Sequence, residues 1–240
     1  ERNFTFEIIG RDFKKEVWSL TGPVKADKAA DKNFKTPAKL NQRENYDPMN
    51  MMTEKIAVTK RIDEIYRLHN GNLEIINRVK DKSEIANLPP NFPTFSWAMD
   101  VAYDSRRDIV TVVTLGGEGV LYRFDAKRKK WIDFRSLNNI DLCSLSYDES
   151  KDRYVAWNTM GDGDLYFISA EGEALFKRNI ISKLAGFGRL YDRGNGPPPC
   201  LKIAPHGDDI ALIHMRGNTV TNIWCYDVKS DMAILTYKNP

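Results

Sequence analysis

The amino-acid sequence of this 240-residue chain predicts an all-β protein built from about four similar four-stranded sheets. Three observations lead to this fold class. One segment of the chain recurs at a fixed spacing, short apolar runs alternate with polar turns inside each copy, and the apolar runs are rich in Val, Ile, Tyr, Phe and Trp, which favour half-buried strands. A hydrophobic fraction of 42% over this length is sufficient for a sizeable core.

The repeat is clearest between residues 101–134 and 145–178, which align without a gap at an offset of 44 residues. The matching pairs at this offset include Tyr103 and Tyr147, Asp104 and Asp148, Asp108 and Asp152, Gly117 and Gly161, Gly119 and Gly163, and Leu121 and Leu165. Such internal repetition indicates a repeat architecture.

Two further copies extend the repeat. Residues 200–237 form a third copy at an offset of 57, which sets Asp209 against Asp152. A fainter fourth copy, residues 64–78, matches the hairpin at 120–134 at an offset of 56. The chain therefore holds about four copies of one unit.

Each copy of roughly 40 residues reads as four antiparallel strands, and this period is typical of a β-propeller blade. The sequence predicts a propeller of about four blades, or four blades of a larger ring. The run "SWAMDVAYDSRRDIVTVVTLGGEGVLYRFDAKRKKW" resembles the blades of kelch-like and WD40-like propellers, and of uncharacterised bacterial propeller proteins with the same pattern. The copies lack the Trp-Asp dipeptide and the Asp-box, so the resemblance implies a fold and leaves the function open.

Residues 1–240 are expected to form a single propeller-like domain with two insertions. Residues 3–10 and 16–20 look like strands that complete the first blade. Residues 21–53, punctuated by prolines and poor in apolar side chains, predict a long exposed loop insertion. Residues 184–199, rich in Gly and Pro, predict an insertion between blades.

The glycine run Gly116-Gly117-Glu118-Gly119 raises the question of a phosphate-binding loop. Such a loop needs a helix after the glycines, and here the strand-like run "VLYRFD" follows. We therefore expect a turn in which glycine adopts a positive φ. The acidic group Asp162, Asp164 and Glu171 is interpreted in the same way, as a solvated turn.

No catalytic, metal-binding or cofactor-binding set is predicted. The repeated aspartates are expected to cap turns through hydrogen bonds to the backbone. His69 and His206 fall in turns and His214 in a strand, without the spacing of a metal site. Cys143 and Cys200 are expected to pack as apolar side chains on the innermost strands.

A non-enzymatic interaction or scaffold module that presents rim loops is the function we expect from these features. The insertion holds the aromatic and arginine side chains common in interface hot spots, and its predicted partner-binding residues are Phe187, Arg189, Leu190, Tyr191 and Arg193. The partner is expected to be another protein or a second copy of the chain.

Other partners are weaker alternatives. The basic stretch 25–43 could contact an acidic partner or a membrane surface, but a nucleic-acid partner would also need aromatic stacking platforms, and the stretch holds only Phe34. No apolar run is long enough to span a membrane.

An enzyme of another class is the alternative to an interaction module. Some propellers carry a metal-assisted hydrolase or lactonase site at the axial opening. Asp100 and Asp141, expected on or near inner strands, are the residues that such a site would use here. The cellular compartment is left open by the sequence.

Overall fold

The computed structural model describes a large part of the chain, and its contacts divide the chain into two units, residues 1–48 and 49–240. The described ranges are 6–9, 15–18, 55–58, 64–69, 72–77, 79–86, 97–115, 119–137, 140, 142–158, 163–187, 201–216 and 219–239. The predicted loop insertion 21–53 lies outside them, and the single-domain assignment stays a prediction.

The first unit contributes one short hairpin. Strands β1 (Phe6–Ile9) and β2 (Lys15–Trp18) pair antiparallel in a two-stranded sheet of their own. The expectation that this segment completes the first blade is wrong, because the sheet that follows already has four strands between residues 55 and 86.

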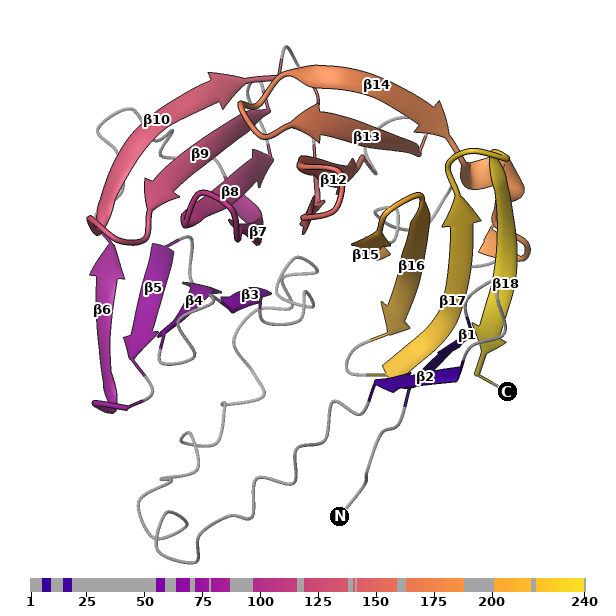
Figure 1. The fold of residues 1–240 in the computed structure, drawn as a ribbon, viewed down its shortest axis with the longest axis horizontal. Coiled ribbons are helices and arrows are strands. Elements are labelled where there is room, and N and C mark those ends of the chain that lie inside the picture. Colours follow the sequence, from indigo (N-terminus) through magenta and orange to yellow (C-terminus); the bar gives the residue numbers. More distant parts are fainter. Residues whose placement is uncertain are drawn as a thin grey trace, which may run out of the picture. The chain divides into compact units, whose positions relative to one another are not determined.

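The second unit is a four-blade β-propeller, as predicted (Figure 1). Each blade is a four-stranded antiparallel sheet whose strands follow one another in the chain. Their bounds are β3 (Lys55–Val58), β4 (Glu64–His69), β5 (Asn72–Asn77) and β6 (Lys82–Ala86) in blade 1; β7 (Trp97–Asp104), β8 (Ile109–Leu115), β9 (Val120–Asp125) and β10 (Lys130–Ser136) in blade 2; β11 (Ser144–Asp148), β12 (Arg153–Trp157), β13 (Asp164–Ser169) and β14 (Ala174–Asn179) in blade 3; and β15 (Leu201–His206), β16 (Asp209–Arg216), β17 (Thr219–Asp227) and β18 (Met232–Lys238) in blade 4.

Consecutive blades pack side by side through their first strands. Strand β7 lies against β3 and β11, and β11 lies against β15. These first strands are therefore the inner strands, and the fourth strand of each sheet is the outer edge. This places Cys143, directly before β11, at the inner end of blade 3, where it is buried as expected; Cys200 lies outside the described residues.

The core lies between blades and not within them. One buried cluster joins blades 1 and 2, around Tyr66, Val112 and Phe124. A larger cluster joins blades 2, 3 and 4, around Trp157 and Trp224. Each sheet thus stabilises its neighbour, which is why a repeat of this kind cannot fold blade by blade in isolation.

The repeated turns follow one pattern, Tyr-Asp-x-x-x-Asp. The Asp104 carboxylate accepts hydrogen bonds from the backbone N–H groups of Arg106 and Arg107, at 2.9 and 3.0 Å. Asp108 closes the turn with a positive φ of 57° and accepts a hydrogen bond of 2.9 Å from the Tyr103 hydroxyl. The predicted backbone cap is confirmed for the first aspartate, whereas the second accepts a side-chain hydroxyl.

The same turn recurs at residues 147–152 and 226–231, where Asp152 and Asp231 have positive φ and accept hydrogen bonds from tyrosine hydroxyls. The third occurrence, residues 226–231, joins β17 to β18. The turn between the first two strands of blade 4, β15 and β16, is shorter, and His206 pairs directly with Asp209 across it. The expected match of Asp209 with Asp152 is therefore wrong. Two fewer turn residues bring Asp209 into a strand.

The fainter fourth copy also needs a correction. Residues 64–78 align in sequence with the third and fourth strands of blade 2. In the structure they form β4 and β5, the second and third strands of blade 1. Different hairpins of a blade have similar patterns of alternating apolar residues. The alignment therefore identified the two strands correctly but assigned them to the wrong positions in the sheet.

The glycine turns agree with the prediction. Gly119 and Gly163 have φ values of 59° and 72°, a region that side chains with a Cβ rarely adopt. A Cβ on Gly119 would lie 1.9 Å from the Ile140 carbonyl oxygen, so the backbone approaches too closely for any other residue. These glycines shape turns before β9 and β13.

Candidate interaction surface

Blades 2 and 3 each present one face to the preceding blade and one to the following blade. In blade 2, Thr111 faces forward, and its hydroxyl lies 2.7 Å from that of Tyr154 in blade 3. In blade 3, Arg153 faces forward and donates a hydrogen bond of 3.3 Å to the Gly207 carbonyl of blade 4. Blade 4 turns its buried residues Ile210, Leu212, Trp224 and Tyr226 back towards blade 3.

The opposite side of blade 4 is apolar at its centre, and we call it the far face of blade 4. Its side chains follow from the strand register, which sets residues of the four strands in rows. The central row is Ala204, Ala211, Cys225 and Ile234, and the next row adds Ile213, Ile223 and Tyr237.

These side chains are not buried. Ile234 is 61% exposed and Tyr237 44% exposed, while Ile213, Ile223 and Cys225 are half-buried. The forward faces of blades 2 and 3 are instead covered by the blade that follows. Val113 and Val155, for example, are 1% and 0% exposed. Among the described residues of blades 2 to 4, the forward-facing apolar side chains of blade 4 are therefore more exposed than those of blades 2 and 3.

One end of the far face is acidic. The row nearest the β15–β16 turn holds Asp209 and Asp227, which pair across β16 and β17, and the exposed Met232 on the edge strand. Lys202 stands in the row of Ile213 and Ile223, and its ammonium lies 3.4 Å from the Asp100 carboxylate of blade 2. The central row of the face, Ala204, Ala211, Cys225 and Ile234, holds no charged side chain.

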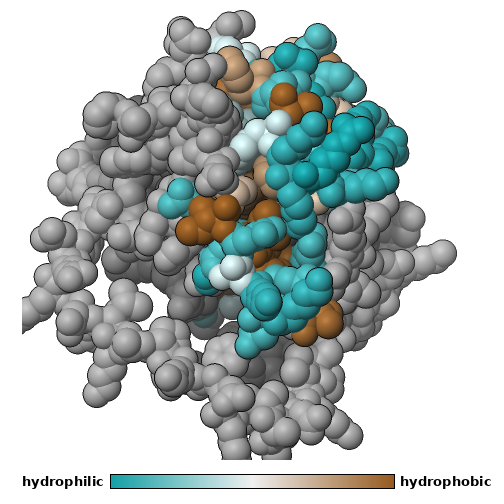
Figure 2. All heavy atoms as spheres, turned by 90° about the vertical axis from the view of Figure 1, so that its left-hand side faces the viewer, coloured by the Kyte–Doolittle hydropathy of each residue, from teal (hydrophilic) through white to brown (hydrophobic). Residues whose placement is uncertain are grey.

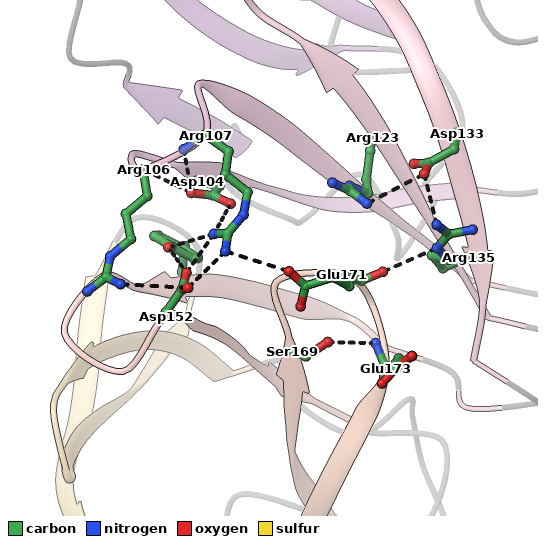
Figure 3. A network of polar contacts seen from close by, with 11 residues as sticks. Asp104, Arg106, Arg107, Arg123, Asp133, Arg135, Asp152, Ser169, Glu171 and Glu173 are labelled. Atoms are coloured by element: carbon green, nitrogen blue, oxygen red, sulfur yellow. Dashed lines mark hydrogen bonds and ion pairs between the residues drawn. The ribbon is translucent and has the colours of Figure 1, made fainter.

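The seam between blades 2 and 3 is polar on one side of the propeller (Figure 3). Arg107, in the β7–β8 turn, donates hydrogen bonds of 2.6 and 2.8 Å to the two carboxylate oxygens of Asp152 and lies 3.1 Å from Asp104. Its guanidinium also lies 3.6 Å from Glu171, whose carbonyl accepts a hydrogen bond from Arg135. Arg106 of the same turn lies 3.6 Å from Asp152, so two arginines join the turns of the two blades.

The protonation equilibria at this seam follow from these contacts. The hydrogen bonds from Arg107 and Tyr147 hold the pKa of Asp152 well below its usual range. The hydrogen bond to Asp152 raises the pKa of Arg107. Burial, followed by the hydrogen bond to Asp152, raises the pKa of Tyr147. The seam is therefore a fixed ion pair at neutral pH.

A cavity of about 280 Å³ lies between the inner strands β7, β11 and β15. The buried carboxylate of Asp100 borders it and accepts hydrogen bonds from the Ser144 hydroxyl (3.0 Å) and the Leu145 N–H (2.9 Å). Lys202 lies 3.4 Å from the same carboxylate. Asp100 thus joins three blades near the axis. Asp141 lies outside the described residues, and the hydrolase interpretation stays a prediction.

The start of the insertion is anchored in the core. Phe187, predicted to contact a partner, is only 2% exposed and packs edge-on between the rings of Trp157 and Trp224, with ring centroids 6.2 and 5.9 Å apart. The Trp224 indole also donates a hydrogen bond of 3.0 Å to the Ala185 carbonyl. Phe187 therefore serves packing within the chain, a role that the sequence interpretation missed. The sequence signal for this role was a phenylalanine that follows Leu184 closely at the start of the insertion and has a glycine on either side.

The other predicted contact residues, Arg189, Leu190, Tyr191 and Arg193, lie outside the described ranges, and their role stays a prediction. Of the acidic group, Asp162 is also outside. The solvated-turn interpretation is wrong for Asp164, which is buried at the start of β13 and bonded to Lys177 and Asn179. His206 is exposed and His214 is buried, as expected; His214 bonds to Thr221.

Elsewhere on the surface, exposed apolar residues are dispersed. Figure 2 shows the side with the outer strands of blades 1 and 2, where small hydrophobic groups are separated by hydrophilic residues. Val79, Ile85, Ile132 and Phe134 are exposed on these two blades. In the part of the chain that the structure describes, no three His, Cys, Asp or Glu side chains cluster as a metal site would require, and no helix has the length and apolarity of a membrane span.

Comparisons with known proteins agree on the fold. No protein-family model and no curated protein sequence matches the chain. Solved structures do. One in the crystal structure of the mitotic checkpoint complex is 10% identical over 79% of this chain and 52% of its own length, with a TM-score of 0.52. The RRP9 WD40 repeats are 9% identical over 78% and 52%, also at 0.52. Hydrazine synthase of Kuenenia stuttgartiensis is 10% identical over 75% and 47%, at 0.51.

The chain is thus a WD40-like β-propeller in fold. It spans about half the length of the solved structures that it matches. At this level of identity the likeness concerns the fold alone. The resemblance to kelch-like blades in particular stays a prediction.

Proposed function

We propose that this protein is a non-enzymatic interaction module, and that its principal contact surface is the far face of blade 4. The accessible apolar centre of that face is the observation that carries the proposal. Four strands about 4.8 Å apart and five residues long at about 3.4 Å give the whole face, including its acidic row, a footprint of roughly 300 to 400 Å². The largest exposed apolar patch on a protein is often a functional surface.

The composition of the face supports binding to protein. It has aliphatic and aromatic side chains in Ile213, Ile223, Ile234 and Tyr237, with Asp209 and Asp227 at one end and Lys202 at the other. This matches the usual anatomy of an interface, in which charged residues are depleted at the core and enriched at the rim. One of the solved propellers that resemble this chain belongs to a protein complex, the mitotic checkpoint complex.

The rim-loop form of the proposal concerns the insertion. Phe187, at the end of the described segment 163–187, packs between Trp157 and Trp224, and the predicted insertion follows it in the sequence. Arg189, Leu190, Tyr191 and Arg193 would then provide a second contact region. Deleting 189–198 while keeping Phe187 tests the loop without removing a core residue.

The far face is tested by one charged substitution with a matched control. Ile234 on β18 and Ile85 on β6 are both outer-strand isoleucines, 61% and 62% exposed, so aspartate at either site should leave the fold intact. Wild-type, Ile234→Asp and Ile85→Asp proteins are immobilised, and the proteins that each retains from an extract of the source cells are compared by mass spectrometry.

A protein retained by the wild type and by Ile85→Asp, but lost from Ile234→Asp, would support the far face once purified and shown to bind directly. A retained set that is the same for all three forms would contradict it. The same comparison with the 189–198 deletion decides whether the loop contributes.

A further inference from the structure

We infer that the axial cavity, the space of about 280 Å³ between the inner strands β7, β11 and β15, binds a small organic monocarboxylate whose charge is held by Lys202. The inference goes beyond the proposed function, because it assigns a ligand to a part of the propeller that the far face does not include. A polar cavity of this volume holds several water molecules, and a small organic molecule can take the place of some of them.

The walls of the axial cavity are edges of sheets. Strands β7, β11 and β15 each stand first in their sheet and pair with one strand only. The Leu145 N–H points away from the paired strand and donates to the Asp100 carboxylate. Because backbone groups alternate in direction along an antiparallel strand, the N–H and C=O of Tyr147 point the same way, and both residues line the cavity. The walls thus offer backbone donors and acceptors to a polar ligand.

The buried carboxylate at the wall is already fully bonded. Oδ1 of Asp100 accepts a hydrogen bond of 3.0 Å from the Val101 N–H and lies 3.4 Å from the Lys202 ammonium. Oδ2 accepts hydrogen bonds from the Ser144 hydroxyl and the Leu145 N–H. Four donors therefore surround one carboxylate. Asp100 fixes the inner strands and leaves the binding of a ligand to its neighbours.

Lys202 is the charged side chain at the wall that retains donors for a ligand. Its distance of 3.4 Å from Asp100 is long for a hydrogen bond between charged groups, which is usually about 2.7–2.9 Å. An ammonium has three N–H donors, and among the described residues Asp100 is its one hydrogen-bond partner. The side chain is 33% exposed, so solvent reaches it. Two donors on a cation are thus left for an anionic oxygen.

The neighbouring carboxylate limits the charge of the ligand. Asp100 offsets part of the positive potential of Lys202, so a second negative charge on the ligand would be repelled. A carboxylate with one charge meets this condition, and a hydroxyl beside it can bond to the backbone groups of Tyr147. Two or three hydrogen bonds in a solvated cavity correspond to a Kd of roughly millimolar. Acetate and the hydroxy acid lactate are therefore suitable probes.

Binding of lactate, acetate and sulfate to the full chain is measured by NMR titration, with chloride keeping the ionic strength constant. We expect the wild type to bind lactate more tightly than sulfate. Lys202→Met keeps the length of the side chain and removes its charge, and should raise the Kd for lactate about tenfold or more. Lys229→Met is the matched control: Lys229 belongs to the same blade and lies 2.7 Å from Asp208, outside the cavity, so the Kd should not change.

A substitution of Asp100 tests the sign of the charge that the cavity selects. Asp100→Asn removes the negative charge beside Lys202 and keeps the shape of the side chain, so the Kd for lactate should fall and the preference over sulfate should shrink. A site for a cation would show the opposite change. Urea unfolding of each variant shows that the protein used in the titration is folded.

Three results would overturn the inference. The first is a wild-type chain that binds neither lactate nor acetate in a saturable way. The second is lactate binding that is the same in wild type, Lys202→Met and Lys229→Met, which would place the anion elsewhere. The third is a Kd for lactate that rises in Asp100→Asn. None of these results bears on the far face, which is tested by the Ile234→Asp comparison.

Discussion

Replacing Phe187 with alanine is expected to lower the free energy of unfolding by about 3–5 kcal/mol, the range for removing a buried phenylalanine. The ring is 2% exposed and lies between Trp157 and Trp224 at the seam of blades 3 and 4. Burial of such a side chain contributes about 2–3 kcal/mol. Two edge-on ring contacts add about 0.5–1.5 kcal/mol each, and part of the total is recovered when the site relaxes.

The assay is urea unfolding followed by tryptophan fluorescence. Trp157 and Trp224 contact the ring that is removed, so their emission reports on the seam itself. A loss of this size corresponds to a fall in Tm of roughly 6–20 °C for a domain of this length. Phe187→Leu fills most of the space and should cost about 1–2 kcal/mol.

The result that would refute the reasoning is a Phe187→Ala protein whose stability changes by less than about 1 kcal/mol, which is the expectation for an exposed contact residue. The control is deletion of residues 189–198, which keeps the ring and should leave the unfolding midpoint nearly unchanged. If the deletion destabilises the protein as much as Phe187→Ala does, the loop itself belongs to the core.

Three further predictions concern other features of the propeller. Asp152→Asn should lower stability by about 1 kcal/mol at neutral pH, as expected for a surface ion pair. The pKa of Asp152 is lowered in the folded state, so the contribution of the ion pair is fully present above about pH 4, the pKa of an unfolded aspartate. The contribution is lost as the pH falls through the folded pKa. The unfolding curves of the two proteins should therefore converge in strong acid. Gly119→Ala should lower the unfolding temperature measured by calorimetry more than Gly186→Ala does. Both glycines have a positive φ, which costs a residue with a Cβ about 1 kcal/mol or more, but of the two only Gly119 would place the new Cβ against backbone atoms. Equal losses of stability would contradict the close approach at Gly119. Asp100→Ala should cost about 2–3 kcal/mol by leaving buried donors of blade 3 unpaired, and Ser144→Ala about 1; a neutral Asp100→Ala would show that the carboxylate does not join the inner strands.

The blades themselves could be predicted from the sequence because their determinants are local. Alternating apolar residues define strands, and the Tyr-Asp-x-x-x-Asp turn repeats because its aspartate satisfies backbone donors within four residues. Gly119 was recognisable because a positive φ is a property of one residue. Each of these features depends on neighbours along the chain, so it leaves a pattern in one sequence.

The correspondence between copies failed where one turn changed length. The β15–β16 turn is two residues shorter than its counterpart in blade 3, and alignment at a constant offset assigned Leu212 to the same face as Val155. In the structure, Leu212 faces backward and Val155 forward. A shift of one residue reverses every side chain of a strand, so the faces of blade 4 could not be predicted from the repeat.

The sequence by itself determined the fold class, the number of blades and the chemistry of the turns. Only the tertiary structure decided that Phe187 is a core residue, that Asp100 joins three inner strands, and that the forward-facing apolar side chains of blade 4 are more exposed than those of blades 2 and 3. Burial depends on which sheet lies opposite a side chain, and that sheet can be distant in the sequence. Lys202 and Asp100, for example, are in contact although 102 residues separate them. An apolar strand has the same sequence pattern whether a neighbour covers it or not, so the exposure of ordinary blade residues is known only when the blades are packed.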